Sequence, residues 1–262
     1  MKIQKNKMSL TEKNLREKKF HNELQSRPKG RFENIFYKAI YASGKDFYSF
    51  LEKNVKGCEV LDYGCGVGIS LEKIINFGPK KIFGIDISEV SIEKAKNRFE
   101  KFQSTVDLKV DNCEKTKFEN DKFDIVYGTG ILHHLDISKS LNEINRILKS
   151  KGFLIFIEPL GTNPIINLYR NMTPNSRSRD EHPLIDKDFY LIKKRFTNIE
   201  IYYYGLLTLV FFPFYGSPKK SFIFKILNKL DQILFKINIF KKLAWSVLII
   251  AKKKLSSCLF SY

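Results

Sequence analysis

A short glycine-rich turn between a strand and a helix constrains the fold of this chain more than any other feature. Residues 60–68 read VLDYGCGVG, so three glycines alternate with other residues directly behind Asp62. The apolar residues before the turn are typical of a strand end, and residues 69–77 have the pattern of an amphipathic helix. Glycine lets a ligand approach the main chain, and the helix behind it offers unpaired N–H groups. The turn therefore favours a nucleotide-like ligand, although glycine-rich turns also serve as plain connections.

Strands and helices alternate along the chain on both sides of this turn. We expect a helix over 32–51, helices near 69–77, 88–102, 136–149 and 186–196, and strands at 58–63, 80–86, 105–110, 123–128, 152–157 and 199–204. Ser88 is placed to cap one of these helices. Such alternation predicts an α/β fold with a parallel sheet covered on both faces, and a ligand at the carboxyl ends of the strands.

Cysteine usage and hydropathy favour a cytoplasmic protein. The cysteines at positions 58, 65, 113 and 258 form no CxxC pair and no spacing with histidine that is typical of a metal site, so we expect reduced thiols and no metal. The first twenty residues lack the apolar run of a signal peptide, and no stretch reaches the eighteen or so apolar residues of a membrane span.

Two details indicate which nucleotide the turn binds. Asp86 follows Gly68 by eighteen residues, a distance at which a carboxylate can accept hydrogen bonds from ribose hydroxyls. A dinucleotide fingerprint would need a glycine at position 69, which is Ile69, and a pyrophosphate would be repelled by Asp62. S-adenosylmethionine carries a sulfonium and an amino group, so a carboxylate beside the turn favours it.

In these motifs the chain resembles the class I S-adenosylmethionine-dependent methyltransferases, of the type-11-like group with small-molecule or lipid-type acceptors. The family's glycine motif is matched by Asp62-x-Gly64-x-Gly66-x-Gly68, its ribose acid by Asp86 in GIDIS, its adenine-side acid by Asp111 in VDNCE, and its fourth-strand motif by FDIVYGTGILHHL. The resemblance covers roughly residues 55–157. It implies a Rossmann-like, doubly wound, seven-stranded and mostly parallel sheet with an antiparallel last strand, plus a helical cap insertion.

The resemblance also implies a division of the chain. We expect a basic, flexible N-terminal arm over residues 1–31 and a methyltransferase domain over 32–262. Within that domain the donor-binding core covers 55–158, acceptor-side and cap segments cover 159–243, and the last strand lies at 244–252.

Ten residues are expected to contact the donor, again by resemblance. Asp62 would lie near the methionine end and Asp86 would bind the ribose diol, while Ile87 would offer an apolar face to the adenine. The full set is Asp62, Gly64, Gly66, Asp86, Ile87, Asp111, Asn112, Cys113, Gly128 and Thr129. Two alternatives stay open: Asp111 as a turn former only, and Gly68 as a glycine that only packs its helix.

Methyl transfer from a sulfonium requires above all that donor and acceptor are aligned. A hydroxyl acceptor also requires a general base that removes its proton. We expect oxygen as the acceptor atom, with carbon and nitrogen as the open alternatives. Candidates for the base are His133 and His134 after the fourth strand, and Glu181 with His182 in RDEHPL, which lie in the acceptor-side segment. Of these, His182, Glu181 and His134 form the expected catalytic set. A donor-side or structural role for His134, and a plain loop role for His182, are the alternatives.

The formal charge of +18 is uneven, since residues 205–262 hold ten lysines and one acid, Asp231. Residues 219–243 form a basic amphipathic segment that either caps the sheet or meets an anionic membrane at the inner face of the cell. A lipid-linked acceptor would fit the second case. An RNA methyltransferase that uses the basic surface, or a non-catalytic scaffold with this fold, are the remaining alternatives.

Overall fold

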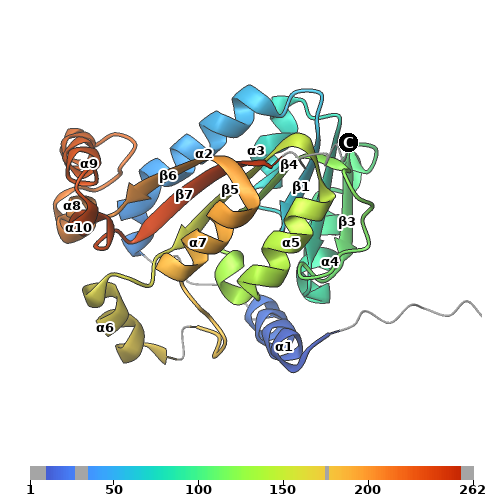
Figure 1. Cartoon of the computed structure of the whole chain (residues 1–262), viewed down its shortest axis with the longest axis horizontal. Helices are drawn as coiled ribbons and strands as arrows, with labels where there is room; N and C mark the ends of the chain where they lie inside the picture. The colour runs from blue at the N-terminus through green and yellow to red at the C-terminus, as the bar shows by residue number, and fades with distance from the viewer. Residues whose placement is uncertain (1–9, 27–34, 175–176, 255–262) are drawn as a thin grey trace, which may run out of the picture.

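A seven-stranded sheet forms the centre of the molecule in the computed structural model, which describes residues 10–26, 35–174 and 177–254 (Figure 1). The strand order is β3-β2-β1-β4-β5-β7-β6, and all neighbours are parallel except that β7 is antiparallel to both β5 and β6. The strands are β1 Glu59–Tyr63, β2 Lys81–Asp86, β3 Val106–Val110, β4 Phe123–Thr129, β5 Leu148–Pro159, β6 Phe196–Tyr204 and β7 Ser246–Lys253. The expected Rossmann-like fold and its antiparallel last strand are thereby confirmed.

Helices cover both faces of the sheet because successive strand residues are apolar on both sides. In β4, Ile125 and Tyr127 pack into the core shared with α2, α3 and α4, whereas Val126 packs into the core shared with α5 and α7. These helices are α2 Tyr41–Asn54, α3 Leu71–Ile74, α4 Glu89–Arg98, α5 Ile137–Ile147 and α7 Asp186–Arg195. Ser88 caps α4 as expected, since its hydroxyl accepts the Ser91 N–H at 3.0 Å.

The N-terminal segment is helical where it is described, which corrects the expectation of a flexible arm. Residues Glu12–Ser26 form α1, which packs against α4, while residues 1–9 and 27–31 lie outside the described residues. Polar contacts hold α1 in place. Arg16 forms two hydrogen bonds with Asp180 at 2.7 and 2.8 Å, and Ser88 donates to Asn22 at 2.6 Å. The polar sequence of this segment predicted disorder. The helix is nevertheless ordered, because the surface against which it packs also provides polar partners.

The cap consists of short helices at one end of the sheet: α6 Pro164–Met172, α8 Leu207–Val210, α9 Phe222–Leu234 and α10 Asn238–Lys241. The expected cap segment 159–243 also contains α7 and β6, which belong to the sheet and its covering layer. The described residues also contain short 3-10 helices: η1 Ile35–Ile40, η2 Ile75–Phe77, η3 Glu100–Phe102, η4 Leu132–His134 and η6 Phe212–Phe214. Among the described helices, none has the length and apolar character needed to cross a bilayer.

Helix α9 is anchored by its single acidic residue. Asp231 is fully buried, and its carboxylate accepts the N–H of Leu207 at 2.7 Å and the hydroxyl of Thr208 at 2.9 Å. Phe224 and Phe235 share the buried face with Asp231. The apolar stripe that the sequence predicted for this helix therefore faces outward over much of its length, with Phe222, Ile223, Ile226, Leu230 and Ile233 exposed.

Candidate active site

A cavity of about 270 Å³ lies at the carboxyl ends of β1, β2 and β4, where the fold places a ligand. Eight of the ten expected donor contacts line it: Asp62, Gly64, Gly66, Asp86, Ile87, Asn112, Cys113 and Thr129. We call it the donor cavity. Asp111 and Gly128 are not part of its lining.

The glycine turn after β1 is shaped by backbone angles that favour glycine. Gly64 and Gly66 have φ values of +78° and +52°. A Cβ atom at Gly64 would lie 2.5 Å from Ile131, whereas a Cβ atom at Gly66 would meet nothing within 4 Å. The main chain at Gly66 is thus open to a ligand on the cavity side.

Asp86 ends β2 and ties the glycine turn to the start of α4. Its carboxylate accepts the Gly66 N–H at 2.9 Å and the Ser88 N–H at 2.8 Å, one on each oxygen. Burial raises the pKa of Asp86, and these two N–H groups oppose that effect. Each oxygen keeps a further lone pair, so the side chain is positioned to accept the hydroxyls of a ribose.

Asp62 presents a buried carboxyl group to the same cavity. It is 3% exposed, and Oδ2 has no hydrogen-bond partner among the described residues. Burial, and next the charge of Asp86, raise the pKa of Asp62 to about 8. A positively charged ligand group would therefore be favoured beside it.

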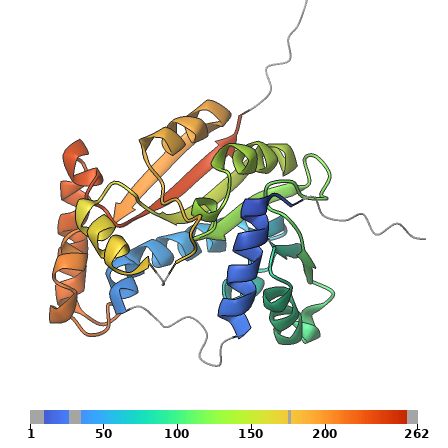
Figure 2. The ribbon, with the colours of Figure 1, turned by 90° about the horizontal axis from the view of Figure 1, so that it is seen from below.

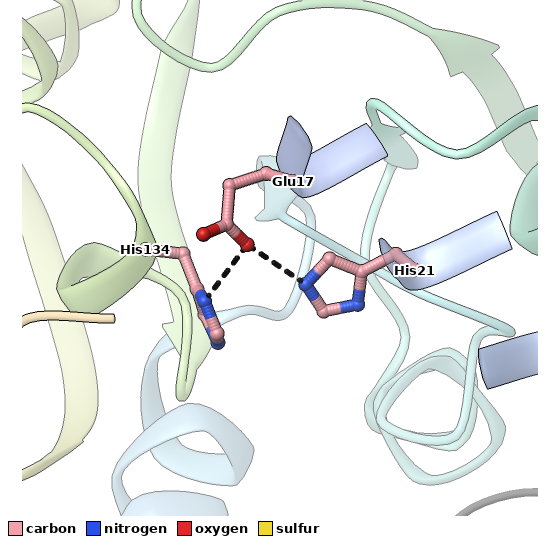
Figure 3. A group of neighbouring side chains, drawn as sticks. All are labelled: Glu17, His21 and His134. Atoms are coloured by element: carbon pink, nitrogen blue, oxygen red, sulfur yellow. Dashed lines mark ion pairs between the residues drawn. The ribbon is translucent and has the colours of Figure 1, made fainter. Parts of the chain in front are cut away.

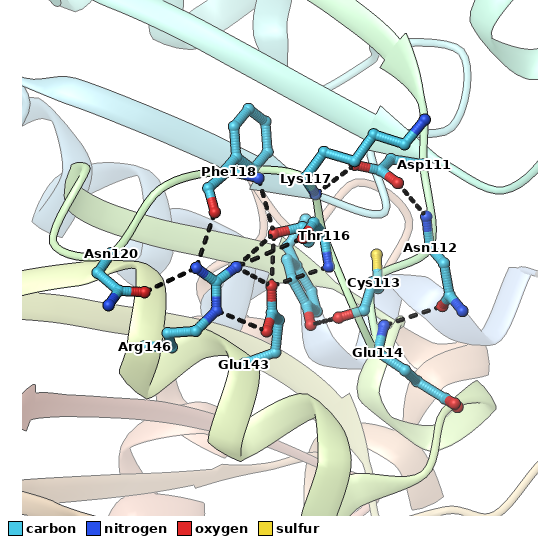
Figure 4. A network of polar contacts seen from close by, with 11 residues as sticks. Asp111, Asn112, Cys113, Glu114, Thr116, Lys117, Phe118, Asn120, Glu143 and Arg146 are labelled. Atoms are coloured by element: carbon cyan, nitrogen blue, oxygen red, sulfur yellow. Dashed lines mark hydrogen bonds and ion pairs between the residues drawn. The ribbon is translucent and has the colours of Figure 1, made fainter. Parts of the chain in front are cut away.

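Asp111 stabilises the turn after β3, residues 111–117, and is not part of the lining of the donor cavity. Its two oxygens accept the N–H groups of Asn112 at 2.9 Å and Lys117 at 3.0 Å. The turn is fastened to α5 by Glu143, which accepts the Thr116 N–H at 2.8 Å and pairs with Arg146 (Figure 4). The turn-forming alternative is thus the one that the geometry favours for Asp111, while Asn112 and Cys113 line the cavity.

Two glycines of the matched motifs allow neighbouring segments to pack closely, because a side chain at either position would clash. A Cβ atom at Gly128 would lie 2.7 Å from Phe156 and 2.8 Å from the carbonyl oxygen of Tyr63. At Gly68 it would lie 2.7 Å from the ring of Phe99. Gly128 therefore lets β4 pack closely against its neighbours, and Gly68 does the same for the turn against the end of α4.

Helix α1 forms a wall of the donor cavity that the motifs did not indicate. Asn14, Glu17, His21, Leu24 and Gln25 line the cavity, and the Asn112 amide donates to Asn14 at 3.3 Å. The first four are spaced three, four and three residues apart, which places them on one face of a helix. That spacing is the signal from which the sequence could have revealed them.

A second cavity of about 1370 Å³ adjoins the first. Apolar and aromatic side chains line it from α1, η1, α6 and α8, and α2 adds Tyr41 and Tyr48 beside polar and charged residues. We call it the acceptor cavity. Tyr37 and Trp245 stack in its wall with ring centroids 5.6 Å apart. Leu24, Thr129 and Gly130 line both cavities. The end of β4 is therefore the boundary between them, and Figure 2 shows α1 and α6 at this end of the sheet.

A histidine and a glutamate form a buried pair in the acceptor cavity. His133 Nδ1 lies 2.7 Å from Glu158 Oε2, and Glu158 Oε1 also accepts the N–H groups of Ile131 and Leu132. A carboxylate can only accept in this arrangement, so the neutral imidazole carries its hydrogen on Nδ1. Nε2 is left with a lone pair and lies 3.7 Å from Glu181 Oε1. The sequence argument named His133 as a candidate base but left it out of the expected catalytic set, and it gave Glu158 no role.

The three expected catalytic residues are placed differently from one another. Glu181 lines the acceptor cavity and His134 lines the donor cavity. His182 lines neither; its side chain is 48% exposed and lies 3.3 Å from Asp188, while its backbone N–H donates to the carbonyl of His133 at 2.6 Å. The geometry thus gives His182 a part in holding the His133 loop, and a direct role for its side chain stays a prediction without geometric support.

Two arginines line the polar end of the acceptor cavity. Arg170 donates to the carbonyl of Leu160 at 2.7 Å, and burial lowers the pKa of Arg170 to about 10. Arg177 donates to the carbonyl of Arg170 at 2.9 Å. An arginine keeps its charge at neutral pH, so this part of the wall favours an anionic or strongly polar group.

Comparison with known proteins supports the fold and the matched motifs. Residues 61–156 match the family model described as a methyltransferase domain. A ubiquinone biosynthesis O-methyltransferase of Pelagibacter ubique is 34% identical over 110 residues, which cover 42% of this chain and 45% of that protein. A sterol 24-C-methyltransferase of Aspergillus fumigatus is 27% identical over 54% of this chain and 40% of that protein. The chain spans less than half the length of these curated relatives.

Solved structures extend the likeness to nearly the whole chain. Geranyl diphosphate C-methyltransferase from Streptomyces coelicolor has a TM-score of 0.65 and 13% identity, covering 94% of this chain and 100% of that one. A phosphoethanolamine N-methyltransferase of Haemonchus contortus has a TM-score of 0.61 and 18% identity, covering 90% and 59%. The predicted resemblance and the class I methyltransferase fold are confirmed.

Proposed function

We propose that this chain, which contains a methyltransferase domain of the class I fold, transfers a methyl group from S-adenosylmethionine to a hydroxyl of a lipid-like acceptor. The observation that carries the proposal is the shared wall at Thr129 and Gly130. In-line displacement at a sulfonium needs the acceptor atom opposite the leaving sulfur, so donor and acceptor must meet across one boundary. Such alignment can lower the barrier by about 7 to 11 kcal/mol.

The acceptor class follows from the lining of the larger cavity. Its aromatic and aliphatic side chains suit a long apolar body, and Arg170 with Arg177 suits a polar or anionic group at one end. The relatives and structural neighbours include a ubiquinone biosynthesis O-methyltransferase, sterol methyltransferases and a geranyl diphosphate methyltransferase. A quinone precursor or a polyprenyl-linked compound is the kind of acceptor we expect.

His133 is the group we assign as general base. Its side chain lines the acceptor cavity, and Glu158 holds the ring through Nδ1 and would stabilise the imidazolium that forms when Nε2 takes up a hydroxyl proton. S-adenosylmethionine supplies an activated methyl group when bound, so the chain's own residues position both molecules, remove the proton and exclude water.

Transfer of a labelled methyl group tests this function directly. The purified chain is incubated with methyl-labelled S-adenosylmethionine and a lipid extract of the source organism, and the organic phase is counted. We expect label in an organic-soluble product that resists mild alkaline hydrolysis, as an ether does. Label confined to RNA added in a parallel reaction would instead favour the nucleic-acid alternative.

Donor binding is expected to release a proton below pH 8. Because the pKa of Asp62 is about 8, its carboxyl group is mostly neutral at pH 7, and a cationic ligand favours the ionised form. The affinity for S-adenosylmethionine should therefore rise between pH 6 and 7.5 by up to about tenfold per unit. Titration calorimetry in buffers of different ionisation enthalpy counts the proton. Asp62→Asn should bind more weakly and without proton release, and a wild-type chain that releases none would contradict this assignment.

We further propose that the exposed face of α9 rests on an anionic membrane, which would bring a lipid-like acceptor to the cavity. Apolar side chains of α6 and α9 are exposed: Ile165, Leu168, Met172, Phe222, Ile223, Ile226, Leu230 and Ile233. Exposed lysines accompany them on the cap: Lys219, Lys220, Lys225, Lys229, Lys236 and Lys242. This combination is typical of helices that lie in the membrane interface, and each lysine can contribute about 1 kcal/mol near anionic lipid.

Charge reversal on this surface should abolish vesicle binding. We expect Lys225→Glu, Lys229→Glu and Lys236→Glu together to weaken sedimentation with phosphatidylglycerol vesicles by about 100-fold at low salt, since three favourable charges become repulsive. The matched control is Lys96→Glu, Lys101→Glu and Lys115→Glu, three exposed lysines near the β3 edge of the sheet. If the control loses binding equally, only the overall charge matters, and α9 has no special role.

A further inference from the structure

Glu17, His21 and His134 meet in the wall of the donor cavity, and none belongs to the set of expected donor contacts (Figure 3). Glu17 Oε2 lies 3.2 Å from His134 Nδ1 and 3.6 Å from His21 Nε2. Glu17 and His21 are four residues apart on α1, so both side chains leave the same face of the helix. His134 comes from η4, directly after the boundary strand β4.

Glu17 is a buried carboxylate with an incomplete set of partners. It is 4% exposed, and Oε1 accepts the hydroxyl of Ser178. Neither Glu17 Oε2 nor His134 Nδ1 has a hydrogen-bond partner with good geometry among the described residues. Burial raises the pKa of Glu17, but the two histidines and Ser178 together hold it well below its ordinary value. Burial lowers the pKa of His134, so that imidazole is neutral and does not balance the charge.

A buried negative charge of this kind favours a cation in the cavity, since an uncompensated carboxylate is costly away from water. Asp86 already accepts two backbone N–H groups at the ribose end of the cavity. The Glu17 cluster approaches the acceptor cavity through His134, whose ring centroid lies 4.2 Å from that of His133, and His133 lines the acceptor cavity. Glu17 therefore belongs to the side of the donor cavity that faces the acceptor.

We infer that Glu17 binds the positively charged sulfur end of the methyl donor, so that α1 distinguishes the sulfonium donor from its neutral thioether product. The inference rests on the proposed function and adds a recognition group to it. After transfer the sulfur loses its charge, the attraction to Glu17 is lost, and the product is released more readily. Glu17 on α1 thus interacts with the charge that only the donor carries. Asp86 and the glycine turn contact the adenosyl moiety, which donor and product share.

The test compares two ligands that differ in that charge. Dissociation constants of the full chain for S-adenosylmethionine and S-adenosylhomocysteine are measured by calorimetry for wild type and Glu17→Gln. We expect the variant to weaken donor binding by about tenfold or more and product binding by less than about threefold, because only the donor loses a charge–charge attraction. Glu12→Gln, on the same helix with a side chain 95% exposed, should change neither constant.

A second variant separates charge recognition from the mere presence of the helix. Arg16→Ala with Asn22→Ala removes contacts that hold α1 and leaves Glu17 intact. It should weaken the binding of the product as well as that of the donor, because every contact that α1 makes with the cavity is disturbed, whereas Glu17→Gln should spare the product. Equal losses for both ligands in Glu17→Gln, or no loss, would overturn the inference.

Zinc is titrated into both proteins as well, because two histidines and a carboxylate also suit a divalent metal. Stoichiometric zinc binding that Glu17→Gln abolishes, together with unchanged preference between donor and product, would assign the cluster to a metal and overturn the inference. A wild-type chain that binds neither adenosyl ligand would overturn the proposed function itself.

Discussion

Replacing Asp86 by alanine is expected to weaken S-adenosylmethionine binding by about 100-fold or more. Two charge-assisted hydrogen bonds to the ribose diol would be lost, each contributing about 1.5 to 3 kcal/mol. The same substitution removes the acceptor for the Gly66 and Ser88 N–H groups, so the glycine turn also loses its anchor. Calorimetric titration of the variant against wild type measures the effect.

Asp86→Asn is the matched control, because an amide keeps one acceptor oxygen for the turn and loses the charge. It should bind the donor with intermediate affinity and melt below wild type, because its NH2 group meets one of the two N–H groups that Asp86 accepts. Unchanged donor affinity in Asp86→Ala, with a folded protein shown by its circular dichroism, would exclude this carboxylate from the donor site.

Replacing His133 by alanine should slow methyl transfer by about 10² to 10⁴ while donor affinity stays within about twofold of wild type. His133 lines the acceptor cavity, its Nδ1 is held by the Glu158 carboxylate, and its Nε2 lies 3.7 Å from Glu181 Oε1. Single-turnover transfer of labelled methyl to the lipid extract of the transfer assay reports the step. The pH profile of the variant should lose its lower limb, because that limb reports protonation of the base.

His182→Ala distinguishes between the base proposed from geometry and the one expected from sequence. Its side chain lies outside both cavities, so we expect a loss of less than about tenfold. A drop in His182→Ala as large as in His133→Ala, with the pH profile altered in the same way, would return the role of base to His182.

The sheet and the donor motif could be predicted because both follow from local patterns. Parallel strands buried on two faces are continuous apolar runs, and the glycines and acids that follow them stand at strand ends that the topology brings together. The predicted strands therefore agree with the observed ones within a few residues, except that β5 begins four residues earlier, at Leu148, and β6 three residues earlier, at Phe196.

The parts that escaped prediction depend on contacts between distant segments. The pairing of His133 with Glu158 requires β4 and β5 to be neighbours, and Glu158 alone in the sequence is an ordinary acid at a strand end. The polar helix α1 is held by partners such as Asp180, far along the chain. Asp231 was counted as the one acid in a basic region, but it is the buried anchor of α9.

The measurement that tests this account most directly is a calorimetric titration of the full chain with S-adenosylmethionine, with NAD⁺ titrated separately. One molecule of S-adenosylmethionine should bind per chain, and NAD⁺ should give no heat of binding. Absence of binding by S-adenosylmethionine, or saturable binding of NAD⁺ in its place, would contradict the assignment of the donor cavity.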